Sequence, residues 1–145
     1  MQPRNTQKMK KIFTLIFLLT ISSTVFGQTL SEKEIYGKWK VEKIIKKPTN
    51  PQFATLIDGF ENATFFFNQN GNFKLTTTSK SELFGMITEM TNGTKWKVEQ
   101  NKQYIKIGNQ EDGYSIMGIS VKENNGKKTF HLDESGITLE MKKTE

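Results

Sequence analysis

The stretch GKWKVEKI, residues 37–44, decides the fold that this chain is expected to adopt. Trp39 and Val41 fall on one side of an extended backbone, and the charged residues between them fall on the other. A period of two residues is typical of a β-strand that is buried on one face only. The sequence therefore predicts a half-buried strand that begins with one of the chain's two tryptophans.

A short helical turn is predicted immediately before this strand, over residues 31–36. Ser31 can cap its first turn, and Glu34 follows three residues later, which is the spacing of a capping box. Gly37 ends the turn, because glycine readily adopts the backbone conformation that follows a helix. The tryptophan strand thus starts directly after a capped turn.

The rest of the chain reads as short strands joined by tight turns. Hairpins are predicted over residues 63–78, 94–108 and 114–132, and a last strand over 137–142. Eight or nine strands with turn signals every eight to twelve residues indicate a barrel or a sandwich. Because the hairpins join sequence neighbours, we expect an all-β fold: an antiparallel up-and-down barrel of about eight strands.

Two segments interrupt the strand pattern. Residues 51–59 predict a short helix in the first long loop. Asn50 is suited to cap this helix, and Pro51 is suited to its first position. Its apolar face would be formed by Phe53, Leu56, Ile57 and Phe60. Residues 81–92 are ambiguous: their apolar spacing fits a helix, but the surrounding strands favour a strand, which is the prediction adopted here. The apolar residues concerned are Leu83, Met86, Ile87 and Met90.

Residues 1–27 have the pattern of a secretory signal peptide, with Met9 as an alternative start. A lysine cluster precedes an apolar run over residues 12–21. This run is shorter than the roughly 20 residues that a membrane-spanning helix needs. Cleavage after Gly27 would leave residues 28–145 as one domain, exported to the periplasm or out of the cell.

Composition excludes several classes of function. The chain has no cysteine, so neither a disulfide nor a lipid-modified N-terminus is expected. The net charge is +6, but four basic residues and no acidic ones lie within residues 1–27, which leaves about +2 for the domain. Such a small excess gives no support for a nucleic-acid partner. No stable membrane anchor is expected, and the oligomeric state stays open.

The side chains needed for catalysis are sparse. His131 is the single histidine, and it lies between two apolar residues of an alternating strand, so it is expected to face outward. One histidine without any cysteine argues against a metal site. No base can be paired with the serines to make a nucleophile. We therefore expect neither an enzyme nor a metal or other cofactor.

Three short motifs, in this order, resemble those of small secreted bacterial lipocalin-like domains of the lipocalin superfamily. They are GKWKV (37–41), FFFNQNGNFKL (65–75) and NGTKWKVE (92–99), and the likeness extends over residues 31–143. The resemblance implies a structural role for Gly37 and Trp39, with the indole plugging the closed end of the barrel beneath the first helical turn. It also implies that a basic side chain, Lys142 or Lys143, lies over the ring.

The function expected from this resemblance is the binding of a small apolar or amphipathic ligand. The helix at 51–59 would lie over the open mouth, and the ligand would contact Phe53, Leu56, Phe65, Phe67, Phe73, Phe84, Met86 and Trp96. Aromatic rings, Tyr104 among them, leave a narrow lumen in a barrel of this size. The alternative is a filled barrel that acts as a protein-interaction or inhibitor module of the cell envelope, with an exposed Phe66 as part of its surface.

Overall fold

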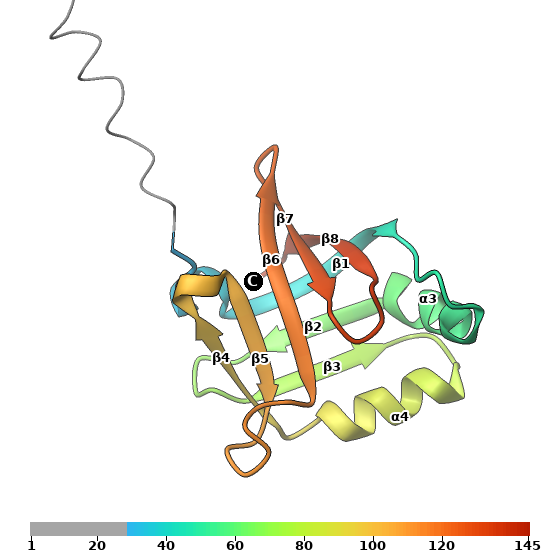
Figure 1. The fold of residues 1–145 in the computed structure, drawn as a ribbon, viewed down its shortest axis with the longest axis horizontal. Coiled ribbons are helices and arrows are strands. Elements are labelled where there is room, and N and C mark those ends of the chain that lie inside the picture. Colours follow the sequence, from blue (N-terminus) through green and yellow to red (C-terminus); the bar gives the residue numbers. More distant parts are fainter. Residues whose placement is uncertain (1–28) are drawn as a thin grey trace, which may run out of the picture.

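The computed structural model describes residues 29–145, and the predicted signal peptide lies outside the described residues. Eight antiparallel strands form one sheet that curls into a nearly closed barrel (Figure 1). The predicted fold class is therefore confirmed. The strands are β1 (Gly37–Lys46), β2 (Ala63–Phe67), β3 (Phe73–Thr77), β4 (Lys95–Glu99), β5 (Tyr104–Gly108), β6 (Met117–Asn124), β7 (Lys127–Leu132) and β8 (Thr138–Lys143).

The order of strands in the sheet is β3-β2-β1-β8-β7-β6-β5-β4, so most strands pair with their sequence neighbours and β1 also pairs with β8. The two edge strands, β3 and β4, meet at a seam. There Asn72 and Lys95 form an isolated bridge, and the Phe73 amide donates to the Thr94 carbonyl oxygen over 2.9 Å. These few bonds are what nearly closes the barrel.

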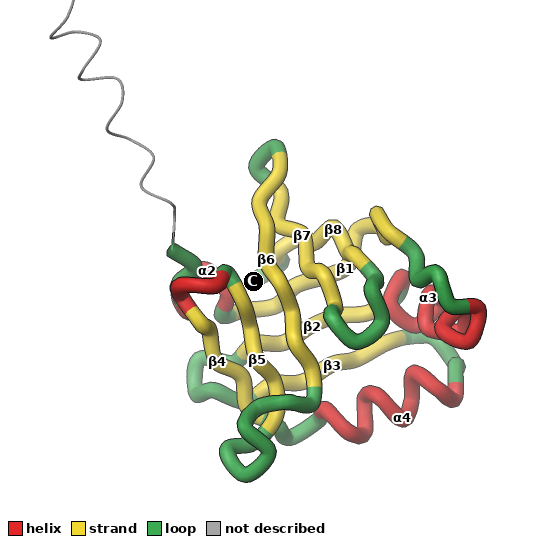
Figure 2. The backbone as a smooth tube through the Cα atoms, in the orientation of Figure 1, coloured by secondary structure: helices red, strands yellow, loops and turns green. Residues whose placement is uncertain are grey.

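The helices are short and lie at two ends of the barrel (Figure 2). The first, α2 (Glu32–Ile35), lies on one side. On the other side, a 3₁₀ turn (Pro51–Phe53) leads into α3 (Ala54–Glu61), and α4 (Glu82–Thr91) packs against α3. A second 3₁₀ turn (Gln100–Lys102) joins β4 to β5. The predicted helix in the first long loop is present, and it extends two residues further than expected.

Residues 81–92 are helical, and the strand predicted there is wrong. The Ser81 hydroxyl oxygen caps the helix by accepting a hydrogen bond from the Phe84 amide over 3.3 Å. Phe84 is fully buried, whereas Leu83, Met86 and Met90 are exposed. The apolar residues of this segment follow a helical period. The buried face of the helix packs against α3, where the Phe84 ring lies edge-on against Phe60 with the ring centroids 4.8 Å apart. This contact favours the helix over a strand.

Helix α4 also packs against the edge strand β3. At its C-terminal end the side-chain oxygen of Asn92 accepts a hydrogen bond from the Leu75 amide of β3 over 3.2 Å. Leu75 lies on an edge strand, where a backbone amide without a neighbouring strand needs another partner. The helix therefore stabilises the sheet where β3 and β4 are not paired.

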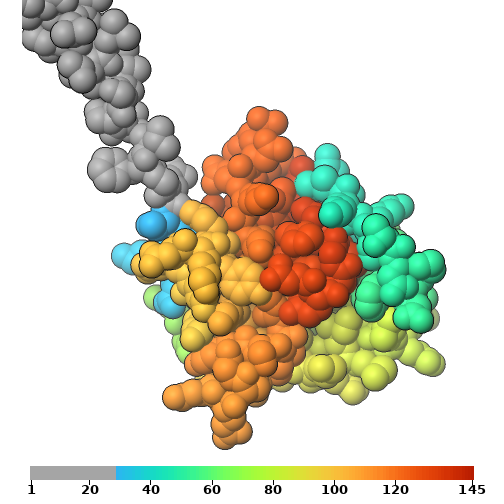
Figure 3. Space-filling model, viewed as in Figure 1, coloured from blue at the N-terminus to red at the C-terminus, as the bar shows by residue number. Residues whose placement is uncertain are grey.

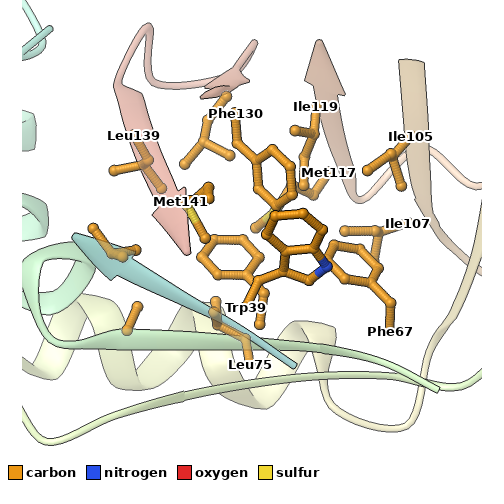
Figure 4. Packing of buried hydrophobic residues seen from close by; sticks show 14 of the residues in the cluster. Trp39, Phe67, Leu75, Ile105, Ile107, Met117, Ile119, Phe130, Leu139 and Met141 are labelled. Carbon is orange, nitrogen blue, oxygen red and sulfur yellow. The ribbon is translucent and has the colours of Figure 1, made fainter. Parts of the chain in front are cut away.

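Aromatic rings fill the interior of the barrel. Phe65, Phe67 and Phe130 are fully buried and contact one another, with ring centroids between 5.9 and 6.3 Å apart. The cluster continues through Trp39, whose ring lies 5.5 Å from Phe130 (Figure 4). Tyr104, however, does not fill the lumen as expected. It shares the outer face of β5 with Lys106, because β5 alternates and its inward positions belong to isoleucines.

Trp39 lies at the end of the barrel that α2 covers. Its indole N–H donates a hydrogen bond to the Ile35 carbonyl oxygen over 2.7 Å, and only 4% of the residue is exposed. The Lys143 ammonium lies 5.5 Å from the centre of the indole, so the basic residue over this ring is Lys143. Burial, and to a smaller degree the neighbouring Lys128, lowers the pKa of Lys143.

Gly37 begins β1 in a conformation that favours glycine, with a φ of +124°. A β-carbon at this position would overlap the backbone of Glu145, which lies against β1. The Lys38 amide donates to the Glu145 carbonyl oxygen over 3.2 Å. The glycine thus lets the C-terminal residue pack beside the first strand.

Candidate ligand-binding site

A cavity of about 200 Å³ lies between the two larger helices and the nearby strand ends. Below it is called the α3/α4 cavity. The helical side contributes Phe53, Leu56 and Phe60 from the α3 region, and Ile87, Met90 and Thr91 from α4. The opposite side is formed by Ile116, Met117, Leu132, Glu134 and Ser135. Figure 3 shows where these parts meet: the red surface of the β7–β8 connection borders the green surface of α3 and the yellow-green surface of α4.

Close contact between α3 and α4 shapes one wall of the cavity. Gly59 faces the Phe84 ring so closely that a β-carbon on Gly59 would overlap it. The Gly59 carbonyl oxygen also accepts a hydrogen bond from the Thr77 hydroxyl over 2.8 Å, which fixes α3 to the end of β3. The glycine therefore sets the distance between the two helices.

The β7–β8 turn forms the opposite rim and is fixed to the start of β6. The Asp133 amide donates to the Gly118 carbonyl oxygen over 3.1 Å, and the Gly118 amide donates to Oε1 of Glu134 over 2.9 Å. The Tyr104 hydroxyl donates to Asp133 over 2.7 Å. Burial of the phenol, together with this bond, raises the pKa of Tyr104. These bonds hold the rim in one position.

Two of the eight residues predicted to contact a ligand, Phe53 and Leu56, line the α3/α4 cavity. The structure places the other six elsewhere. Three of them, Phe65, Phe67 and Phe73, belong to the packed interior of the barrel. Phe84 lies on the buried face of α4 and packs against Phe60. Met86 is 60% exposed and does not line the cavity, and Trp96 borders a different hollow.

The lining residues that sequence reasoning missed come from three distant parts of the chain. Ile87, Met90 and Thr91 could have been found by taking 81–92 as a helix with one face turned inward. Nothing in the sequence marks Ile116, Met117 or Leu132 as neighbours of that helix. They reach the cavity because the barrel brings the ends of β6 and β7 beside α3 and α4.

The hollow beside Trp96 is polar and lies near the seam, between the β2–β3 turn and the β5–β6 loop. Its walls carry Asn70, Lys95, Asn109, Gln110 and Glu111. The Trp96 indole N–H donates to the Asn68 carbonyl oxygen over 2.9 Å, and the residue is almost entirely buried. Only two aromatic side chains, Trp96 and Tyr114, add apolar surface to its walls, whereas the α3/α4 cavity is lined mainly by apolar side chains. The α3/α4 cavity is therefore the better candidate site.

Within residues 29–145, no histidine, cysteine or carboxylate side chains gather in groups of three or more that could hold a metal ion. None of the helices in this part of the chain is long and apolar enough to cross a membrane.

Comparison with known proteins gives no relative: no family model, curated protein or solved structure matches this chain. The architecture itself, eight antiparallel strands in a nearly closed barrel, is consistent with a lipocalin-like fold.

Proposed function

We propose that this protein is a lipocalin-like binding barrel, not an enzyme, and that it holds a small apolar or amphipathic ligand in the α3/α4 cavity. The observation that carries the proposal is the cavity itself, about 200 Å³ with eight apolar side chains among its eleven lining residues. Apolar walls with a few polar groups are typical of small-molecule sites. A cavity of about 150 Å³ is enough for benzene, so the ligand is of the size of one ring or a short chain.

The packed interior supports this location for the ligand. Since Phe65, Phe67 and Phe130 occupy the middle of the barrel, a ligand there would have to displace rings that contact each other. Displacing them would expose apolar surface and disrupt close packing. At the end of the barrel covered by α3 and α4, a ligand can bind without displacing these rings, because the α3/α4 cavity is already present.

The experiment is a titration of the protein, isotopically labelled for NMR, with 2-phenylethanol, a neutral one-ring probe. We expect the resonances of cavity residues, above all the Met90 and Met117 methyl groups, to shift and saturate. A probe with so few atoms binds with a dissociation constant on the order of 1 mM. Shifts that fail to saturate, or that fall outside the cavity, would overturn the proposal.

A pair of variants on the same helix provides the control. Ile87→Trp places a larger side chain in the cavity, so it should abolish binding of the probe. Met86→Trp makes the same kind of change one residue earlier, on an exposed side chain, and should leave the affinity unchanged. If both variants bind equally well, the probe does not use the α3/α4 cavity.

Export is the proposed location, and the sequence pattern of residues 1–27 supports it. Expressed with its full N-terminus in a bacterium, the protein should be recovered outside the cytoplasm with Gln28 as its first residue. Terminal sequencing by mass spectrometry checks this. An intact N-terminus on exported protein would contradict the proposed cleavage site.

A second function, that of a protein-interaction module, is favoured by the outer face of α4. Leu83 and Met86 are exposed there, three residues apart on one side of the helix, and neither lines the α3/α4 cavity. The Phe66 side chain expected to form this surface is partly buried, and the Lys38 ammonium lies 5.7 Å from its ring centre. Native mass spectrometry of protein purified from its own host separates the two functions: a bound small molecule supports the first, and a bound protein lost in Met86→Glu supports the second.

A further inference from the structure

The polar side chains of the α3/α4 cavity are three: Thr91, Glu134 and Ser135. Among the described residues that line the cavity, Glu134 is the only one with a charge, and no lysine lies among them. The polar part of any ligand must therefore be compatible with a carboxylate. This restricts the chemistry of the ligand more than the apolar walls do.

Glu134 is held at the rim by the hydrogen bond that its Oε1 accepts from the Gly118 amide at 2.9 Å. The backbone of the preceding residue is bonded to the same glycine. The hydrogen bond from the Gly118 amide occupies Oε1, and the second carboxylate oxygen of Glu134, Oε2, takes no part in it. A carboxylate oxygen has room for more than one hydrogen-bond donor. Glu134 is exposed to solvent and therefore offers acceptor capacity beside the cavity.

Thr91 also presents an acceptor. Its hydroxyl donates a hydrogen bond to the Ile87 carbonyl oxygen over 2.8 Å, within the same helix. A hydroxyl group has a single proton, so what remains at the Thr91 oxygen is a lone pair. The residue is 1% exposed, and a ligand group facing it would have little water to replace a missing bond. Ser135 can donate a hydrogen bond through its hydroxyl proton, but it carries no positive charge that would offset the negative charge of Glu134.

We infer that the α3/α4 cavity selects apolar ligands whose polar group donates hydrogen bonds, protonated amines first, and disfavours carboxylates. The inference rests on the proposed function and adds the class of ligand. An ammonium group gains attraction and a hydrogen bond at Glu134. A ligand carboxylate would lie near a like charge, and it would find no cationic partner among the lining side chains.

The test uses three probes of nearly equal size: 2-phenylethylamine, 2-phenylethanol and phenylacetate, titrated into the full domain near neutral pH and at low salt. We expect the amine to bind tightest and phenylacetate weakest, with about a fivefold difference or more between the two. Raising the ionic strength from about 0.01 M to about 1 M should remove most of this difference, because the charge on Glu134 is then screened.

Glu134→Gln is the decisive variant. The glutamine oxygen can still accept from the Gly118 amide, so the rim should keep its position. We expect the affinity for the amine to fall about threefold and the affinity for the alcohol to fall less, so that the preference for the amine is lost. Glu89→Gln is the matched control, since Glu89 is exposed on α4 and does not line the cavity. It should change none of the three affinities.

The outcomes separate the inference from the function on which it rests. If phenylacetate binds as tightly as the amine, or if selectivity for the amine survives in Glu134→Gln, the inference is overturned and the binding function stands. If none of the three probes binds, both are overturned.

Discussion

The α-carbon of Gly59 on α3 lies so close to the Phe84 ring of α4 that no β-carbon fits between them. The two helices that line the cavity therefore meet at a glycine and a fully buried aromatic ring. The same ring packs edge-on against Phe60, which itself lines the cavity. The separation of α3 and α4, and with it the volume of the cavity, depends on this contact.

Replacing that glycine should open the helix pair. In Gly59→Ala the added methyl group overlaps Phe84, and overpacking of this kind lowers stability by about 1–3 kcal/mol. Urea unfolding measures the loss, and the probe titration should show weaker binding of 2-phenylethanol. Gly85→Ala is the control: nothing lies within 4 Å of its added carbon, so it should stabilise α4 by roughly 0.5–1 kcal/mol. Equal effects of the two substitutions would contradict this account.

Trp39 should be among the residues most sensitive to substitution. It is almost fully buried, and its indole nitrogen is bonded to Ile35. Trp39→Ala is expected to lower the free energy of unfolding by about 3–5 kcal/mol, measured by urea denaturation. Tyr36→Ala, at an aromatic residue that is 39% exposed, should cost less than about 1 kcal/mol. A comparably small loss for Trp39→Ala would show that the indole does not support this end of the barrel.

Glu34 should make stability depend on acid pH. The hydrogen bond from the Ser31 amide holds the pKa of Glu34 below its ordinary value, and Lys128 adds to the effect. Since the folded-state pKa is depressed, the contribution is present above the unfolded value of about 4.3 and is lost as pH falls through the folded value. Thermal unfolding at pH values below about 5 should therefore show a steeper decline for the native protein than for Glu34→Gln. Parallel curves would rule this carboxylate out as a source of acid sensitivity.

The seam between β3 and β4 should depend on Asn92. In Asn92→Ala the Leu75 amide loses the acceptor that it has on the Asn92 side chain. Leaving a backbone amide without a partner costs about 1–3 kcal/mol, so the hydrogen exchange of the Leu75 amide should accelerate roughly tenfold. Asn101→Ala, at an exposed position in the β4–β5 connection, should leave the exchange of Leu75 unchanged. Unaltered exchange in Asn92→Ala would mean that the helix does not protect the edge strand.

Much of the fold could be predicted from local pattern. Alternation over 37–44 and the turns at 69–71 and 124–126 located strands and hairpins correctly, because backbone geometry imposes a period of two on any half-buried strand. The error at 81–92 shows where local pattern ends. Its apolar spacing is helical, whereas the strands on either side of it favour a strand, and the packing of Phe84 on Phe60 stabilises the helix.

The candidate site was the hardest part to predict. Phe53 and Leu56 could be named because they lie on the apolar face of a recognisable helix. Phe65 and Phe67 look equally suitable for a ligand, yet they contact other rings and leave no space beside them. An aromatic residue in the sequence does not reveal whether its neighbour will be a ligand or another side chain.

The sequence by itself determined most of the strands, their turns and the capped helix before Trp39, since these follow from periods and caps within a few residues of chain, and its hairpins between neighbours favoured an antiparallel barrel. Tertiary structure alone decided where the barrel is filled and where a cavity remains. That outcome depends on which side chains are brought together from distant parts of the chain, as Glu134 and Thr91 are on the two sides of one cavity. Close packing is a property of the assembled side chains, and no short segment contains it.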